Sequence, residues 1–147
     1  MSEMTLAPAR TICLISQPHA VKRARDEVMA SARGWGLSEE KLQHLQLLTS
    51  ELVTNTLPHA EGQAIEVRTE HRGECVVLDV WDPAPPISKA NATLTMPEAM
   101  AESGRGLPLV ETFSSQWYER PSADRGGKHL IAHIPLVGVT CGCVEEQ

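Results

Sequence analysis

The stretch ELVTNTLPHA, residues 51–60, closes an apolar pattern of helical period and then meets a proline. Leucines recur three or four positions apart up to and into this stretch, as on the buried stripe of an amphipathic helix: Leu42, Leu45, Leu48 and Leu52. Glu51 and Asn55 are one helical turn apart, so their side chains leave one face about 40° from each other around the axis. Because Pro58 disfavours helical geometry at Leu57, we predict that this helix ends or kinks just past Asn55.

A carboxylate and a carboxamide on one helix face could serve one small site. The Glu51 carboxylate could orient or deprotonate a hydroxyl, and the Asn55 amide oxygen could bind a hard cation such as Mg²⁺. The same spacing is common on solvated helix faces, so both interpretations stay open on this pattern alone.

One strand and one helix are predicted upstream. Residues 10–16 (RTICLIS) form a short β-type run, and apolar residues then recur at helical spacing until Gly34 or Gly36. Ser38 offers a hydroxyl to cap the following helix, whose first turn carries Glu39 and Glu40 next to the positive end of the helix dipole.

Downstream, the period changes to that of strands. Residues 65–69 alternate between apolar and charged, and residues 75–81 are apolar at nearly every position. A short helix beginning near Gly104 is followed by two further strand-like runs, at residues 115–121 and 128–136. This order predicts an α+β fold: a two-layer α/β sandwich with helices on one face of a mixed, mostly antiparallel sheet.

Composition excludes several classes of function. The 147 residues carry a formal net charge of −6, which disfavours direct binding to nucleic acid. No apolar run approaches the roughly 18 residues of a membrane span, and the start MSEMTLAPAR lacks the apolar core of a signal peptide. We therefore expect a cytoplasmic protein that binds neither nucleic acid nor membrane.

The four cysteines do not form the pattern of a disulfide framework, and we expect reduced thiols. Cys13 and Cys75 each stand alone in apolar runs. Cys141 and Cys143 could supply half of a metal site, but no second pair of Cys or His stands at suitable spacing, so an ordinary tail is the simpler interpretation.

Two further segments could contribute to a binding site. Asp82 follows the apolar strand directly, where it could accept from an exocyclic amine or, as an alternative, from backbone N–H groups in an Asx-turn. Gly104 and Gly106 flank Arg105 just before a helix whose start could bind a phosphate. Residues 87–103 between these segments form a long irregular connection, typical of a lid or binding loop.

The order of these segments resembles the Bergerat-fold ATP-binding domain of the gyrase, histidine kinase and MutL superfamily. SELVTNTLPHA is followed by Asp at a strand end, a long loop, GRGLPLV and GGKHLIAHI. Within that superfamily the chain is most similar to the single-domain anti-sigma factor serine/threonine kinases of actinobacterial type. The resemblance spans about residues 10–136.

The resemblance implies a role for each matching residue. Glu51 would act on the attacking hydroxyl or water, and Asn55 would bind Mg²⁺. His59 would end this motif near the nucleotide, and Asp82 would recognise the adenine amino group of ATP. The phosphate-binding segment comprises Gly104, Arg105, Gly106 and Leu107, and residues 87–103 would be the ATP lid.

The chain departs from the family pattern in three places, one of which is Pro58 inside the motif that contains Glu51 and Asn55. The family's glycine-containing motif after the aspartate is replaced by Pro83, Ala84, Pro85 and Pro86, which removes backbone donors and flexibility. His129 stands where the family often has a hydroxyl residue after GGK. These changes predict a divergent member with reduced ATP affinity or kinase rate.

Two functions remain open from the sequence. One is an ATP-binding, anti-sigma-factor-like regulator with serine/threonine protein kinase activity toward an anti-sigma antagonist. The other is a non-catalytic module that sequesters a sigma factor or antagonist, with weak or no ATP binding. The expected organisation is a disordered segment at residues 1–9, the ATP-binding domain at residues 10–136 and a tail at residues 137–147. The resemblance also implies a homodimer.

Overall fold

The structure is a computed structural model that describes residues 9–85 and 106–136, with the backbone alone described for residues 106–109. The elements within these ranges are β1 (Ala9–Ile15), α1 (Pro18–Ala32), the 3₁₀ turn η1 (Arg33–Trp35), α2 (Glu39–Thr54), α3 (Leu57–Ala60), β2 (Ala64–His71), β3 (Cys75–Asp82), α5 (Gly106–Phe113), β4 (Gln116–Pro121) and β5 (Lys128–Pro135). The lid expected at residues 87–103, together with Gly104, Arg105, Cys141 and Cys143, lies outside the described residues.

The described strands form one sheet in the order β1-β2-β3-β5-β4. Each neighbouring pair in this sheet is antiparallel. The prediction of an α+β fold is confirmed. The sheet was predicted to be mixed and mostly antiparallel, and among the described strands every pair is antiparallel. The strand with the most continuous apolar sequence, β3, lies in the middle of the sheet, a position typical of such strands.

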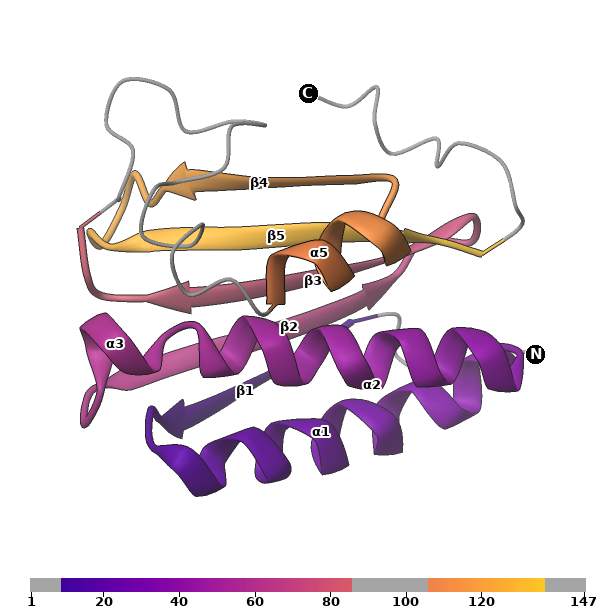
Figure 1. The fold of residues 1–147 in the computed structure, drawn as a ribbon, viewed down its shortest axis with the longest axis horizontal. Coiled ribbons are helices and arrows are strands. Elements are labelled where there is room, and N and C mark those ends of the chain that lie inside the picture. Colours follow the sequence, from indigo (N-terminus) through magenta and orange to yellow (C-terminus); the bar gives the residue numbers. More distant parts are fainter. Residues whose placement is uncertain (1–8, 86–105, 137–147) are drawn as a thin grey trace.

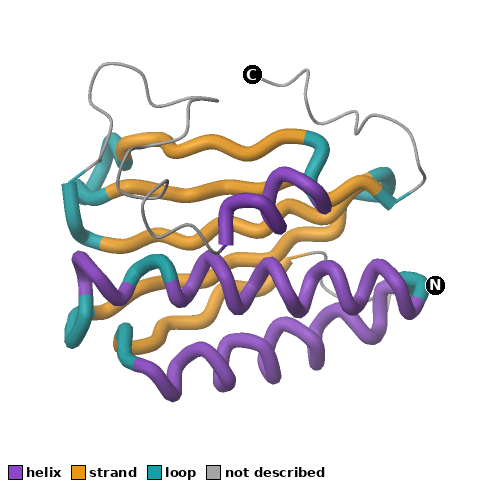
Figure 2. Tube along the Cα trace, viewed as in Figure 1, coloured by secondary structure: helices purple, strands orange, loops and turns teal. Residues whose placement is uncertain are grey.

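The helices form a second layer on one face of the sheet (Figures 1 and 2). α1 and α2 lie side by side, and α5 packs next to α2. In α1, Pro18 occupies the first helical position, where its missing N–H costs no helical hydrogen bond. The inward stripe of α1 includes the fully buried Ala24 and Ala32, whose small side chains allow close packing.

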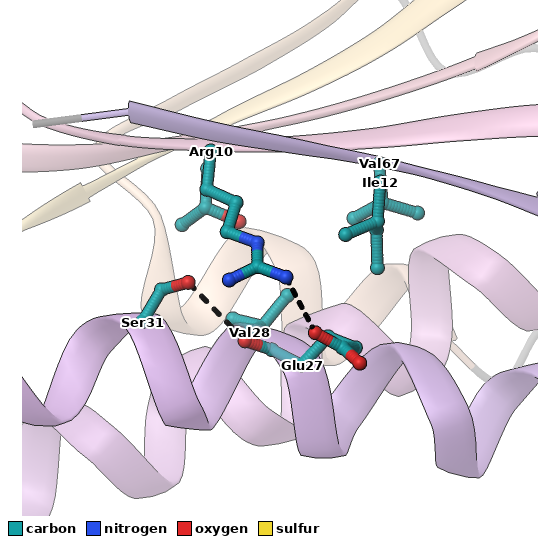
Figure 3. A pocket seen from close by; sticks show the side chains of 7 residues that line it. Arg10, Ile12, Glu27, Val28, Ser31 and Val67 are labelled. Atoms are coloured by element: carbon teal, nitrogen blue, oxygen red, sulfur yellow. Dashed lines mark hydrogen bonds and ion pairs between the residues drawn. The ribbon is translucent and has the colours of Figure 1, made fainter. Parts of the chain in front are cut away.

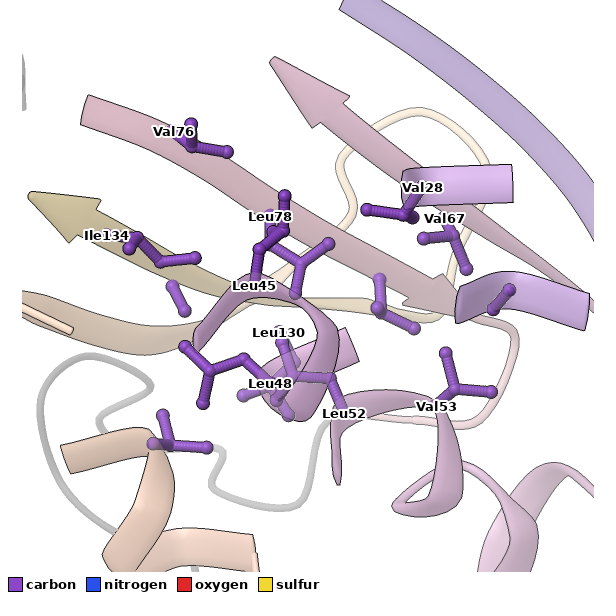
Figure 4. Close-up of a cluster of buried hydrophobic side chains, with 14 of the residues drawn as sticks. Val28, Leu45, Leu48, Leu52, Val53, Val67, Val76, Leu78, Leu130 and Ile134 are labelled. Atoms are coloured by element: carbon purple, nitrogen blue, oxygen red, sulfur yellow. The ribbon is translucent and has the colours of Figure 1, made fainter. Parts of the chain in front are cut away.

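The core lies between the two layers (Figure 4). Ser38 caps α2 as predicted, because the Lys41 N–H donates to the Ser38 hydroxyl at 3.1 Å. The inward face of α2 packs against the central strands, and the largest fully buried side chains there include Leu45, Leu48, Ile65, Leu78 and Ile134. None of the helices in the described ranges combines the length and apolar character that a membrane span needs.

The opposite face of the sheet carries a smaller apolar cluster of Cys75, Val77 and Ile131, with Tyr118 packed against it. Cys75 is fully buried and disulfide-bonded, so the expectation of a reduced thiol is wrong for this residue. Cys13, exposed on the edge strand β1, is a free thiol.

Candidate functional site

The α2 helix ends where the sequence predicted. Its last residue is Thr54, and Asn55 is the C-cap, with its N–H donating to the Glu51 carbonyl at 3.0 Å. The chain then turns into the four-residue helix α3, which contains Pro58 in its first turn. The predicted break between α2 and α3 is therefore present, and it changes the direction of the chain after Asn55.

Hydrogen bonds from a distant loop hold this junction. The Thr56 hydroxyl donates to the Val53 carbonyl at 2.8 Å and shares a 2.6 Å hydrogen bond with the Ser16 hydroxyl. Both hydroxyl residues are buried, Ser16 at 0% and Thr56 at 2% exposure. The segment between β1 and α1 thus fixes the direction of the α2–α3 break.

The short helix α3 brings His59 to the end of β3. The His59 Nε2 atom lies 3.9 Å from the Asp82 Oδ2 atom. This Nε2 atom is buried and has no hydrogen-bond partner in the described structure. Two residues that the sequence assigned to one site, 23 positions apart, are thus neighbours.

Asp82 is buried and already hydrogen-bonded. Its Oδ1 atom accepts from the Ala84 N–H at 2.9 Å, which is the Asx-turn that the sequence left open as an alternative. The Lys128 ammonium donates to both carboxylate oxygens, at 2.8 Å to Oδ1 and 2.9 Å to Oδ2. The exposed fractions of the two side chains are 5% for Asp82 and 3% for Lys128. This is a buried ion pair.

Lys128 is a site residue that the sequence reasoning missed. His129, which stands where the family often has a hydroxyl residue, does not contact Asp82, because its Nδ1 atom lies 2.8 Å from Asp79 Oδ1 on the opposite face of the sheet. Alternation along β5 could have revealed this. Leu130 and Ala132 belong to the core, so Lys128, in phase with them, must face the helices as well.

The turn before β5 is clamped so that Lys128 meets Asp82. Gly127 has a φ of +80°, and a Cβ atom there would lie 2.1 Å from the Asp82 carbonyl oxygen. The Trp81 indole N–H donates to the Gly126 carbonyl at 2.9 Å, and the Arg125 guanidinium stacks 3.9 Å from the centre of the Trp81 ring. Arg125 also binds Glu66 through two hydrogen bonds of 2.8 and 2.9 Å.

Burial favours the uncharged form of the His59 imidazole. Desolvation lowers the pKa of His59 below its ordinary value, and the nearby Lys128 ammonium lowers it further, while Asp82 and Glu119 act in the opposite direction. Glu119 comes from β4 and is almost fully buried. Elements α3, β3, β4 and β5 therefore contribute one polar group each to this buried corner.

Glu51 and Asn55 lie at the same edge of the molecule. Figure 1 shows four chain segments together at its left: the carboxyl end of α2, the helix α3, the end of β3 and the start of β5. Both side chains are partly exposed, and neither makes a hydrogen bond or ion pair within the described ranges. Gly106 and Leu107 begin α5, while Gly104 and Arg105 fall outside the described residues.

Two other features of the described ranges do not form a binding site. In the described ranges, no three His, Cys, Asp or Glu side chains gather as a metal site would require. A small depression between β1 and α1 is crossed by the 2.9 Å ion pair of Arg10 and Glu27, and it has no room for a water molecule (Figure 3). It lies on different elements from the edge that carries Asp82.

The sequence model of the histidine kinase-like ATPase domain matches residues 14–134, from β1 to β5. The chain belongs to this family. No curated protein matches the sequence. A histidine kinase-like ATPase domain implies ATP as its ligand. The edge of the molecule that carries His59 and Asp82 fits a nucleotide in one respect. The His59 Nε2 atom is buried without a partner beside Asp82, a polar atom that a bound group or water would satisfy.

Proposed function

We propose that this histidine kinase-like ATPase domain is an ATP-binding, anti-sigma-factor-like regulator with serine/threonine protein kinase activity toward an anti-sigma antagonist. The observation that carries the proposal is the meeting of the α2 end, α3, the β3 end and the β5 start at one edge, with Asp82 buried among them. The partners would be a sigma factor, its antagonist protein, and a second copy of this chain in a homodimer.

The residues expected from the sequence have distinct roles in this proposal, and His59 would lie near the nucleotide. Asp82 would accept from the amino group of adenine, Asn55 would hold Mg²⁺ through its amide oxygen, and the start of α5 at Gly106 and Leu107 would donate backbone N–H groups to phosphate. Gly104 and Arg105 belong to the same segment of the sequence. Bound Mg²⁺–ATP would supply the phosphoryl group.

The Glu51 carboxylate is the proposed proton acceptor. It would take the proton of a serine or threonine hydroxyl on the partner protein as that oxygen forms its bond to the terminal phosphorus. The bond from that phosphorus to the bridging oxygen breaks, and ADP leaves with the electron pair. In such transfers the protein mainly positions groups and compensates charge, which matches the small number of polar side chains at this edge.

The second candidate is the non-catalytic module with weak or no ATP binding. The ion pair of Asp82 with Lys128 favours it, because the carboxylate that would contact adenine is already paired and buried. In this case the same surface would sequester a sigma factor or antagonist without phosphoryl transfer.

Calorimetric titration with Mg²⁺–ATP tests the nucleotide site. We expect saturable binding by the wild type, and loss of its Mg²⁺ dependence in Asn55→Ala. Thr54→Ala is the matched control, because Thr54 is the exposed neighbour at the same helix end. Unchanged Mg²⁺-dependent binding by Asn55→Ala would remove Asn55 from the site.

Transfer of label from γ-labelled ATP to candidate antagonist proteins separates the two functions. We expect the wild type to label an antagonist serine or threonine, and Glu51→Gln to bind ATP normally but to transfer at least 100-fold more slowly, about 2.7 kcal/mol in the barrier. Glu61→Gln, at the exposed end of α3, is the control. If ATP binds but no antagonist is labelled, the non-catalytic module is supported. Sedimentation equilibrium tests the homodimer directly.

A further inference from the structure

The ion pair of Asp82 and Lys128 occupies the carboxylate on which base recognition would depend. Lys128 donates to both oxygens of Asp82 at 2.8 and 2.9 Å, and both side chains are almost completely withdrawn from solvent. Among the described residues, Asp82 is the only hydrogen-bond partner of the Lys128 ammonium. The ammonium of Lys128 therefore directs its described hydrogen bonds to Asp82 alone, in a corner that also holds the buried Glu119.

The acceptor capacity of Asp82 is nearly filled. A carboxylate offers about four lone-pair positions. The Lys128 ammonium uses one lone-pair position on each Asp82 oxygen, and the Ala84 N–H uses the second position on Oδ1. The remaining position is on Oδ2, the oxygen that lies 3.9 Å from the His59 Nε2 atom, which has no hydrogen-bond partner in the described structure. An incoming amino group would thus meet an acceptor that is largely used and electrically neutralised.

The backbone prevents Lys128 from withdrawing easily. Asp82 and Lys128 are directly paired in the β3–β5 register, so their Cα atoms are held opposite each other. The turn before Lys128 is fixed by the close approach of Gly127 to the Asp82 carbonyl and by the hydrogen bond from Trp81 to Gly126. Moving the ammonium away would leave a buried carboxylate unpaired, which is costly.

We propose that Lys128 is a specificity-determining residue that competes internally for Asp82 and so makes the site insensitive to the 6-amino group of a purine. This inference rests on the proposed function, because it takes Asp82 as the base contact. An ammonium and an aromatic amino group are both hydrogen-bond donors, so they compete for the same oxygens. Purine nucleotides then bind mainly through their phosphates, and the site gains little from the amino group that separates ATP from its 6-deamino analogue.

Calorimetry with two nucleotides tests this. The probes are ATP and purine riboside 5′-triphosphate, which lacks the 6-amino group, each with Mg²⁺. We expect the wild type to bind both within a factor of two. Lys128→Thr, which removes the ammonium but leaves a hydroxyl near Asp82, should prefer ATP at least tenfold, equivalent to about 1.4 kcal/mol. Lys22→Thr, on the exposed face of α1, should keep the wild-type ratio.

The outcomes distinguish this inference from the proposed function. A tenfold preference for ATP in the wild type, or an unchanged ratio in a folded Lys128→Thr, overturns the role of Lys128 and leaves ATP binding intact. If neither nucleotide binds to either protein, both proposals fail. If Lys128→Thr does not fold, the wild-type ratio decides alone: a ratio near one supports the inference and a tenfold preference contradicts it.

Discussion

His133 shows how a single buried imidazole can make stability depend on pH. It lies on β5, facing away from the helices, with 3% exposure, and its Nε2 atom lies 3.2 Å from the Tyr118 hydroxyl. Its Nδ1 atom is buried without a hydrogen-bond partner in the described structure. Desolvation lowers the pKa of His133 below its ordinary value of 6.5, and Arg72 lowers it further.

The sign of the resulting pH dependence is fixed by this lowered pKa. The unfolded chain takes up a proton near pH 6.5, whereas the folded chain resists it to lower pH, so the unfolded state binds more protons in that window. The contribution of His133 to the unfolding free energy is fully present above pH 6.5. It is lost as the pH falls from 6.5 towards the pKa of His133 in the folded chain. The slope from one such group is at most about 1.4 kcal/mol per pH unit.

We therefore predict that His133→Gln reduces the loss of unfolding free energy between pH 7 and pH 5. The measurement is urea unfolding at a series of pH values. Tyr118→Phe is the control, because it removes the hydrogen bond to His133 but keeps the titrating imidazole. A His133→Gln curve parallel to that of the wild type would contradict the prediction.

At the scale of the turn between β4 and β5, two neighbouring glycines make a matched pair. Gly126 and Gly127 both have positive φ, +78° and +80°. A Cβ atom at Gly126 would meet no atom within 4 Å, whereas one at Gly127 would collide with the Asp82 carbonyl and with Pro83. The two positions separate the cost of the backbone conformation from the cost of a collision.

We predict that Gly126→Ala lowers the unfolding free energy by about 1 kcal/mol, because only the left-handed conformation is penalised. Gly127→Ala should cost at least about 2 kcal/mol more, because the turn must move away from Asp82. Urea unfolding of both variants measures the difference. Equal destabilisation would show that the turn shifts freely and that its clamp on Lys128 is weak.

The junction of α2 and α3 depends on the buried hydroxyl pair of Thr56 and Ser16. Thr56→Val should lower the unfolding free energy by roughly 1–3 kcal/mol, because the Ser16 hydroxyl is left buried without its partner. Thr54→Val makes the same chemical change at an exposed position and should have little effect. Chemical unfolding compares the two variants, and a similar small effect in both would mean that the junction is held by other contacts.

Local patterns predicted the elements but not the main polar contact of the site. The Ser38 cap correctly predicted the start of α2, the leucine spacing its buried face, and Pro58 its end. The contact of Lys128 with Asp82 joins residues 46 positions apart and depends on strand register. A shift of one residue exchanges the two faces of a strand, so His129, the neighbour of Lys128, contacts Asp79 and not Asp82.

For the whole molecule, ligand binding and stability are linked. A ligand that binds only the folded chain raises its unfolding free energy, by about 2.7 kcal/mol at a free concentration of 100 times the dissociation constant. We predict that Mg²⁺–ATP raises the thermal midpoint of the wild type, and that the rise is lost in Asn55→Ala. Thermal unfolding over an ATP titration measures this, and an equal rise in Asn55→Ala would contradict the assignment of Asn55.

The strand order has a consequence for synthesis on the ribosome. β5 follows β4 in the chain but is inserted between β3 and β4. While residues up to Phe113 are being translated, the β5-facing edge of β3 has no partner, although Val76, Val77 and Leu78 make this strand apolar on both faces. The nascent chain is therefore an open, aggregation-prone sheet until residues 128–135 emerge and close it.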